Sequence, residues 1–216
     1  MAKRIFDLCT AALALLLLWP LLLLLALWIK LDSPGPVLFR QERVGRHGVL
    51  FRIHKFRTMA VDAPTRGPQI TLNADARLTG VGRRLRQYRL DELPRLIDVL
   101  RGRMSLVGPR PEVPHFVAHY PEVPHFVAHY PEALRVAVLA VRPGLTDPAA
   151  IAHLDEAALL AGAQDPERAY IENILPTKLR LQAEYAGRAT LRSDLAVLLQ
   201  TVSALLGRRR SGAAPS

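Results

Sequence analysis

The feature that most limits how this chain can fold is an uncharged run near its beginning. From Leu8 to Ile29, between Asp7 and Lys30, 22 consecutive residues carry no charge, and most of them are Leu or Ala. A straight helix of that length spans about 33 Å, enough to cross a hydrocarbon core of about 30 Å. No small-residue cleavage site follows the run, which argues against a cleaved signal peptide. We therefore expect a membrane helix.

Two features argue against a plain span. Pro20 lies in the middle of the run, where a proline removes one backbone hydrogen bond and kinks a helix. Basic residues also flank the run on both sides, Lys3 and Arg4 before it and Lys30 after it, and basic flanks favour the cytoplasmic side. The residues alone leave a tilted span and a re-entrant helix, which returns to the same leaflet, both open.

The charge of the chain is concentrated in one block. The net charge is +10, and residues 33–110 alone carry 16 basic and 6 acidic side chains. Such a block should attract phosphates, anionic lipid or nucleic acid, although a solvated basic face explains it equally well. A content of 50% apolar and 22% charged residues excludes a disordered chain and a protein with many membrane spans. The single cysteine, Cys9, excludes an internal disulfide and a multi-cysteine metal site.

The rest of the chain is predicted to be mainly helical with one β-hairpin. The hairpin is expected from two apolar runs, 37–41 and 49–53, around a turn that contains Gly45 and Gly48. Residues 60–76 have the composition of a polar loop. Helical patterns cover 81–89, 91–100, 132–141, 167–186 and 191–206. The last of these suits a core helix or a helix in the membrane interface.

Two adjacent carboxylates stand at the predicted start of a helix. Asp91 is a favourable N-cap residue, Glu92 suits a first turn, and Pro94 is tolerated there. The free N–H groups of such a helix start favour anions and would keep Asp91 ionised, as a nucleophile needs. Glu92 could hold Mg²⁺ together with waters and substrate phosphate. An ordinary acidic helix cap is the alternative.

The chain also contains one perfect internal repeat. Residues 111–120 read PEVPHFVAHY, and residues 121–130 repeat all ten letters. Two copies are too few for a solenoid. The four histidines at positions 115, 119, 125 and 129 have a spacing that could bind zinc, but the duplication explains their number. We expect the second copy to bulge as a surface insertion that the fold tolerates, because prolines break both copies.

Six ordered motifs give the chain a family resemblance. They are KRIFD at 3–7, SPGPVLFRQERVG at 33–45, HKFRTM at 54–59, LDELP at 90–94, MSLVGPRP at 104–111 and VRPGLT at 141–146. Together they resemble the bacterial sugar transferases, the monotopic polyprenyl-phosphate phosphoglycosyl transferases. The resemblance extends from residue 3 to about residue 206. It departs from the usual family pattern at Arg103, where the family has an acidic residue. It departs again at Asp147-Pro148, so the pocket for the donor sugar is expected to differ.

The resemblance implies a specific activity. Such enzymes transfer a hexose-1-phosphate from a UDP-sugar to polyprenyl (undecaprenyl) phosphate and release UMP, which starts surface glycan assembly for later glycosyltransferases. It implies that Asp91 is the covalent nucleophile, that Glu92 binds Mg²⁺, and that Arg86 contacts the lipid phosphate. It further implies phosphate-binding roles for Lys55, Arg57, Arg110 and Arg142. A re-entrant helix broken at Pro20 is also implied.

These inferences combine into one expected architecture. We expect an α+β fold that is mainly helical, with a small β-hairpin and interfacial amphipathic helices. Residues 1–32 would form the re-entrant membrane helix, 33–206 a catalytic domain on the cytoplasmic face of the bacterial inner membrane, and 207–216 a basic, disordered tail. The alternative is a non-catalytic, membrane-anchored basic protein that binds anionic lipid or nucleic acid. An aromatic content of 6% and the lack of an RNA-binding motif argue against nucleic acid.

Overall fold

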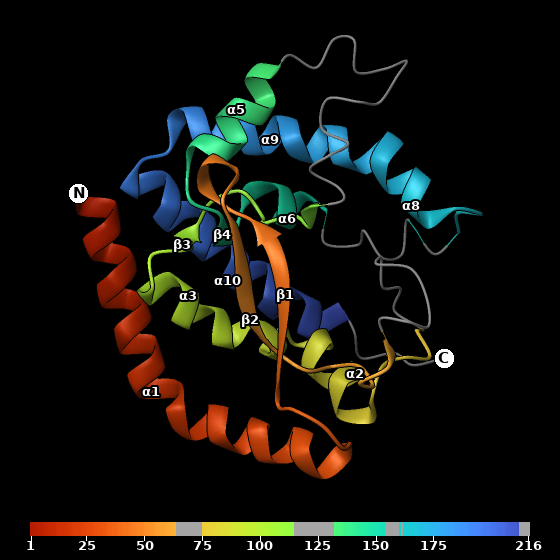
Figure 1. Ribbon diagram of the computed structural model, residues 1–216. Helices are drawn as coiled ribbons and strands as arrows, with labels where there is room; N and C mark the ends of the chain where they lie inside the picture. Colours follow the sequence, from red (N-terminus) through yellow and green to blue (C-terminus); the bar gives the residue numbers. More distant parts are fainter. Residues whose placement is uncertain (64–74, 115–131, 154–159, 161, 212–216) are drawn as a thin grey trace.

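The structure is a computed structural model that describes residues 1–63, 75–114, 132–153, 160 and 162–211. Helices form most of it, together with two two-stranded sheets, which confirms the predicted α+β class (Figure 1). The duplicated decapeptide lies outside the described residues from position 115 on, and with it the four histidines. The same holds for most of the predicted polar loop at 60–76.

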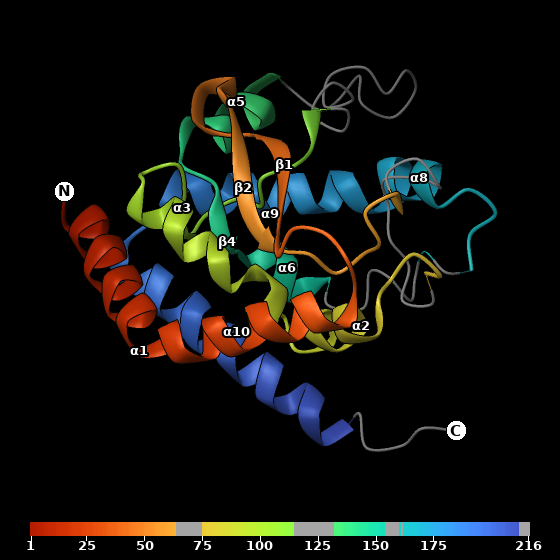
Figure 2. The same cartoon turned by 60° about the horizontal axis from the view of Figure 1, so that its bottom comes forward.

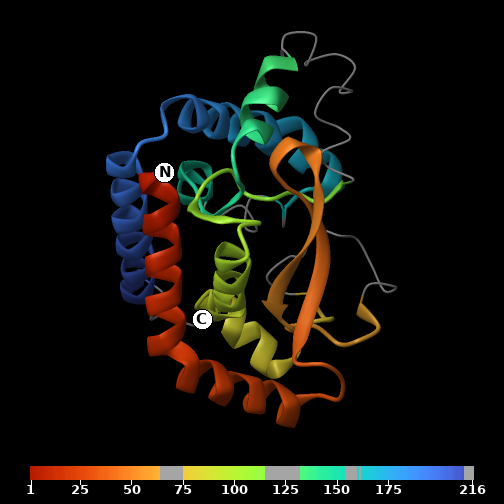
Figure 3. The same ribbon diagram turned by 60° about the vertical axis from the view of Figure 1, so that its left-hand side comes forward.

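The uncharged run forms one long helix, α1 (Ala2–Asp32), which contains Pro20. Figures 1 and 3 show α1 as two arms that meet at a bend, as the proline predicts. The first arm packs on the folded domain through Ala11, which is fully buried, and the second through Leu25 and Ile29. Both arms of α1 therefore contact the same domain.

Between these contacts α1 presents a broad apolar surface. Among the described residues, α1 is the one helix long and apolar enough to cross a membrane, and only 11% of its most apolar 18-residue window is buried. Leu16, Leu17 and Leu24 are each more than half exposed. A core helix of a protein in water would bury these side chains, so this surface suits a lipid environment.

The predicted hairpin is present and longer than expected. Strands β1 (Leu38–Val44) and β2 (Leu50–Phe56) pair antiparallel, with Phe39 opposite Lys55. A short 3₁₀ turn, η1 (Arg46–Gly48), joins them. Each strand extends three residues beyond the apolar runs, because backbone pairing continues through the charged side chains that follow them.

A second sheet was not predicted from the sequence. Strands β3 (Ser105–Val107) and β4 (Gly144–Thr146) pair in parallel, although about forty residues separate them in the chain. Three residues are too few for a readable alternation. The pairing also depends on two glycines, since a Cβ on Gly144 would lie 2.1 Å from the backbone N of Gly108.

The helix predicted for residues 91–100 is two helices. A 3₁₀ segment, η3 (Leu90–Arg95), precedes α3 (Leu96–Leu100), and the N-cap is Arg89 rather than Asp91. Pro94 has no N–H to donate to the carbonyl of Leu90, so an α-helical turn cannot form there. The basic amphipathic segment before it forms α2 (Gly80–Gln87). Thr79 caps the start of α2, since its Oγ1 accepts a hydrogen bond from the backbone N of Gly82.

The C-terminal half is helical, with an interruption that was not predicted from the sequence. Its elements are α5 (Glu132–Ala140), α6 (Pro148–Ala152), α8 (Pro166–Ala169), the π-helical η5 (Tyr170–Ile174), α9 (Leu175–Arg188) and α10 (Leu191–Ser211). The π turn interrupts the predicted single helix 167–186 just before Pro176, whose ring would otherwise clash with the preceding turn.

Helix α10 extends beyond the predicted end of that helix at residue 206 and reaches Ser211 (Figure 2). A single glycine such as Gly207 costs a helix only about 1 kcal/mol. The disordered tail expected at residues 207–216 stays a prediction. The first arm of α1 lies beside α10 (Figure 3), where Lys3 pairs with Asp194.

Candidate active site

The two adjacent carboxylates lie in the first turn of η3 and are buried. Asp91 is 2% exposed and Glu92 is 8% exposed. Arg89, directly before this turn, adopts a left-handed backbone conformation with φ of 56°. Such a conformation is unfavourable for a side chain other than glycine and is often found at functional sites. It starts η3 sharply at Leu90, which brings both carboxylates into the interior.

Lys55 of β2 meets the pair from the hairpin. Its Nζ lies 2.7 Å from Asp91 Oδ2 and 3.9 Å from Glu92 Oε1. Burial lowers the pKa of Lys55, and the two carboxylates oppose that shift. Because its partners are both anionic, the amine fits the role of a fixed positive charge at the centre of the site.

Two arginines complete the surroundings of Glu92. Arg95 Nη2 lies 3.4 Å and Arg110 Nη2 3.5 Å from Glu92 Oε1. Burial alone would raise the pKa of Glu92, but Arg95, Arg110 and Lys55 together outweigh it and hold that pKa far below its usual range. Glu92 is therefore a carboxylate near neutral pH.

Arg95 is a site residue that the sequence did not indicate. It is 2% exposed, and burial lowers the pKa of its guanidinium although Glu92 opposes the shift. Residues three apart in a 3₁₀ helix lie directly above one another, which places Arg95 over Glu92. The sequence holds one indication of this contact, the three-residue spacing of Glu92 and Arg95. That spacing predicts a contact only once the turn is known to be 3₁₀.

Arg86 approaches from α2, where it donates through Nε to Thr58 Oγ1 at 3.0 Å. Helix α2 can lie this close because a Cβ on Gly82 would stand 2.0 Å from the carbonyl oxygen of Thr58. Burial lowers the pKa of Arg86, and the charge of Asp91 is the largest opposing influence. Arg86 therefore adds another cation on the α2 side of the carboxylates.

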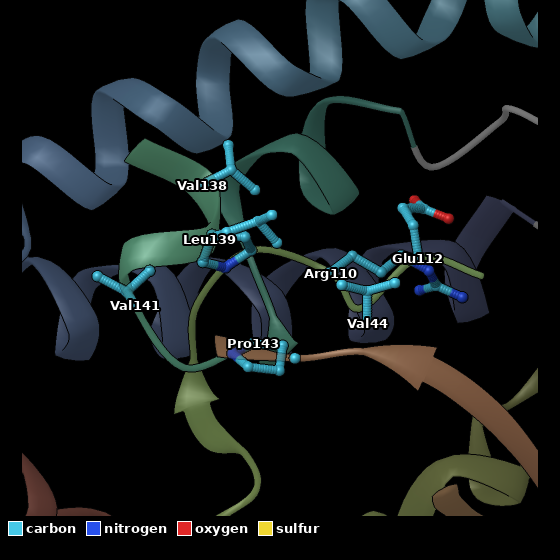
Figure 4. A pocket seen from close by; sticks show the side chains of 9 residues that line it. Val44, Arg110, Glu112, Val138, Leu139, Val141 and Pro143 are labelled. Carbon is cyan, nitrogen blue, oxygen red and sulfur yellow. The ribbon is translucent and has the colours of Figure 1, made fainter. Parts of the chain in front are cut away.

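Arg110 lies at the end of the second sheet, beside a pocket. Figure 4 shows Arg110 and Glu112 at one end of this pocket and Val141 at the other, with Val138 of α5 over it. Glu112 is buried and accepts a hydrogen bond from Tyr170 Oη at 3.0 Å. Burial tends to raise the pKa of Glu112, but nearby cations, Lys178 foremost, hold it below its usual range. Only Arg110 and Glu112 carry charge among the residues that line the pocket.

Comparison with known proteins decides the family. The family model for bacterial sugar transferases matches residues 1–208 of the chain. The chain belongs to the bacterial sugar transferase family. The resemblance seen in the six sequence motifs is thereby confirmed.

Several curated members of the bacterial sugar transferase family are similar to this chain. It is 40% identical over 206 residues to a UDP-glucose:undecaprenyl-phosphate glucose-1-phosphate transferase of Caulobacter vibrioides, which covers 94% of this chain and 69% of that protein. It is 49% identical over 117 residues to the Escherichia coli protein of the same name, covering 54% of this chain and 25% of that protein. It is 48% identical over 118 residues to the UDP-N-acetylgalactosamine-undecaprenyl-phosphate N-acetylgalactosaminephosphotransferase of Aeromonas hydrophila. That match covers 55% of this chain and 28% of that protein. The chain thus spans about a quarter of the length of the last two relatives.

Two arginines that the family resemblance assigned to phosphate lie apart from the carboxylates. Arg57 donates to the carbonyl oxygens of Pro34 and Ser33 at 2.6 and 2.8 Å, and so fastens the end of α1 to the hairpin. Arg142 donates through Nε to the carbonyl oxygen of Gly102 at 2.9 Å. The structure thus brings Lys55, Arg86 and Arg110 to the carboxylates, while phosphate-binding roles for Arg57 and Arg142 stay predictions.

The two carboxylates suit the Mg²⁺ that the family resemblance implies. Asp91 Oδ2 is buried and accepts no hydrogen bond, its contact with Lys55 being an ion pair. In the described part of the chain no three acidic, histidine or cysteine side chains converge on one point. Mg²⁺ is commonly held by one or two carboxylates plus waters and substrate phosphates. Glu92, the residue that the family resemblance assigns to Mg²⁺, is such a carboxylate, and its binding of the metal stays a prediction.

Proposed function

We propose that this family member transfers a hexose-1-phosphate from a UDP-sugar to polyprenyl phosphate and releases UMP. The relatives named above transfer glucose-1-phosphate or an N-acetylgalactosamine phosphate with undecaprenyl phosphate as the acceptor, according to their names. The product would carry its sugar on a lipid diphosphate, and downstream glycosyltransferases would extend it. A protein of Rhizobium leguminosarum, 50% identical over 109 residues, is named for exopolysaccharide production, which fits this first step.

One observation carries the proposal: three cations contact two adjacent buried carboxylates. Asp91 contacts Lys55, and Glu92 beside it contacts Arg95 and Arg110. A diphosphate donor and a lipid phosphate are both anionic, so a site that brings them to a carboxylate nucleophile must offset their repulsion. The net charge of residues 33–110 supplies this offset.

The first step forms a covalent phosphosugar on Asp91. A carboxylate oxygen of Asp91 attacks the phosphorus that bears the sugar, and the bond from that phosphorus to the bridging oxygen breaks. The electron pair leaves with UMP, so no proton has to move. A carboxylate nucleophile needs no general base, and Lys55 would orient it for attack.

The second step returns the enzyme to its starting state. An oxygen of polyprenyl phosphate attacks the same phosphorus, the bond to Asp91 breaks, and the lipid diphosphate sugar leaves. Only one phosphate partner occupies the site at a time, which limits the charge that must be neutralised. Mg²⁺ held by Glu92 would supply charge neutralisation for the phosphate groups of the substrates.

The arrangement of α1 supports a re-entrant helix, and the basic residues that flank its uncharged run support our proposal that the catalytic domain lies on the cytoplasmic face of the inner membrane. Arg4 near the start of α1 donates to the carbonyl oxygen of Val99 at 2.8 Å. At its other end, Asp32 accepts from the backbone N of Val81 at 3.3 Å. Two ends that dock on one folded domain lie on the same side of a bilayer, and the exposed leucines between them would enter the lipid.

Turnover with defined substrates tests the proposal. A membrane fraction with the expressed protein is given undecaprenyl phosphate, Mg²⁺ and each of a panel of radiolabelled UDP-sugars. We expect UMP release and label in the lipid fraction with at least one sugar, and neither product with the Asp91→Asn variant. Binding of anionic lipid without turnover of any donor would support the non-catalytic alternative instead.

A further inference from the structure

Behind Lys55, a histidine and an aspartate form a buried two-point contact. The backbone N of His54 donates to Asp98 Oδ2 at 2.8 Å, and His54 Nδ1 lies 2.7 Å from Asp98 Oδ1. Asp98 is fully buried and His54 is 4% exposed. Both oxygens of one carboxylate are thus engaged by one residue, which fixes the distance and the direction between them.

A third residue determines which ring nitrogen of the histidine carries the proton. Arg101 Nη1 lies 3.2 Å from His54 Nε2. A guanidinium can only donate, so Nε2 accepts and Nδ1 carries the hydrogen. Nδ1 therefore donates to Asp98, and contacts on both sides of the ring set its orientation.

The contact joins the two elements that carry the reacting groups. His54 directly precedes Lys55 on β2, and neighbouring side chains on a strand point to opposite faces. Asp98 lies on α3, which continues directly from the η3 segment that holds Asp91 and Glu92. Lys55 lies on one face of β2 and His54 on the other. The His54–Asp98 contact therefore holds β2 against α3 on the face opposite to Lys55.

We propose that His54 and Asp98 form a clamp that positions Lys55 on Asp91 for the transfer reaction. The clamp residues are positioning residues, since they act through Lys55 and do not touch the substrate. This inference rests on the proposed function. A buried carboxylate costs folding energy that an apolar pair would avoid, whereas two directional hydrogen bonds fix a geometry that apolar packing leaves looser. A misplacement of about 1 Å at a reacting group can cost about a hundredfold in rate.

Two substitutions of His54 separate the effect of its hydrogen bond to Asp98 from the effect of replacing the ring. Asparagine places an amide nitrogen where Nδ1 lies and can still donate to Asp98. Glutamine places its terminal amide where Nε2 lies and loses that donor. His54→Asn should therefore keep the clamp and His54→Gln should break it, and Asp98→Ala removes the acceptor altogether.

The first measurement reports position without activity. Lys55→Cys and Asp91→Cys are combined with Cys9→Ser, and the two new thiols are joined with a short bifunctional methanethiosulfonate. We expect the rate of cross-linking to be unchanged by His54→Asn and to fall at least about fivefold with His54→Gln and with Asp98→Ala, since it follows the effective concentration of the thiols. Equal rates in all four backgrounds would overturn the proposal.

The second measurement links position to turnover. In the chain with native Lys55 and Asp91, kcat for UMP release per folded molecule should stay within about threefold for His54→Asn. It should fall at least about thirtyfold for His54→Gln, with KM for the UDP-sugar little changed. A loss of thermal stability with unchanged kcat would mean a merely structural role and would reject the clamp. If the parent protein turns over no UDP-sugar, the proposed function fails, while the cross-linking rates still decide the clamp.

Discussion

Lys55 Nζ lies 2.7 Å from Asp91 Oδ2, and the two residues come from different elements, β2 and η3. The same amine is 3.9 Å from Glu92 Oε1. One cation thus faces both members of the carboxylate pair, which lets it hold the proposed nucleophile and the proposed metal ligand in a fixed relation.

Removal of the charge at Lys55 should abolish turnover and weaken the fold. In Lys55→Met, Asp91 remains buried without its ion pair, which we expect to lower the free energy of unfolding by about 3 kcal/mol. Lys55→Arg keeps the charge and should lose less stability, but its planar fork places the charge differently, so activity should still fall. Thermal unfolding and UMP release measure the two effects. A Lys55→Met variant as stable and as active as the parent would contradict this role.

Stability should fall in mild acid because of Glu92 and Glu112. The pKa of each is lowered in the folded protein from the usual 4.5. Their contribution is fully present above about pH 4.5 and is lost as the pH falls toward the lower, folded values. Each of the two groups can change the free energy of unfolding by at most about 1.4 kcal/mol per pH unit.

The matched variants Glu92→Gln and Glu112→Gln test that acid sensitivity. Each should flatten the dependence of the unfolding midpoint on pH between about 5 and 3, since an amide does not titrate. Thermal unfolding in detergent across this range gives the slopes. Slopes identical to that of the parent in both variants would show that other groups govern acid unfolding.

Both ends of α1 should lie on the cytoplasmic side. Three variants with a single cysteine are made in a Cys9→Ser background: Ala2→Cys, Ser33→Cys and Val49→Cys. Ala2→Cys keeps Lys3, Ser33 lies just beyond the end of the helix, and Val49, which is 66% exposed, serves as a reference in the domain. An impermeant maleimide should leave all three unlabelled in intact cells and label them after permeabilisation. Labelling of Ala2→Cys alone in intact cells would mean a true span.

The second decapeptide should be dispensable. Of the first copy, Glu112 and Val113 are buried, and the carbonyl oxygen of Glu112 accepts from the backbone N of Val44 at 3.0 Å. The domain already uses the start of that copy, and loop insertions change closure entropy little. Deletion of residues 121–130 should therefore keep or raise turnover and the unfolding midpoint. A deletion variant that folds poorly would show that both copies are integral.

The sequence predicted the parts of the fold that depend on local pattern. The uncharged run, its proline, the apolar runs of the hairpin and the Asp91–Glu92 pair each have a short-range signal, and each is present. The β3–β4 sheet has none, because two three-residue strands meet across about forty residues through Gly108 and Gly144. Long-range pairing of that kind is decided by the whole fold.

The candidate site was predictable by residue type but not by partner. Lys55 and Arg110 were expected to bind phosphate, which stays a prediction, and the structure shows that they contact Asp91 and Glu92. Arg57 and Arg142 are likewise basic residues within the motifs, and nothing in the sequence separates them from Lys55 and Arg110. Their guanidinium groups nevertheless donate to backbone carbonyl oxygens. Arg95 was missed because its place over Glu92 depends on the 3₁₀ turn that Pro94 imposes.

The mass of the protein after reaction with its donor tests the central claim most directly. The purified protein is incubated with Mg²⁺ and each UDP-sugar of the panel, without polyprenyl phosphate, and its intact mass and tryptic peptides are measured. With the donor that supports turnover, we expect one added sugar phosphate on the peptide that carries Asp91, lost again when polyprenyl phosphate is supplied. The Asp91→Asn variant should carry no adduct and release UMP at less than about a tenth of the parent rate. An adduct on another residue, or an Asp91→Asn variant that retains more activity than this, would contradict the account.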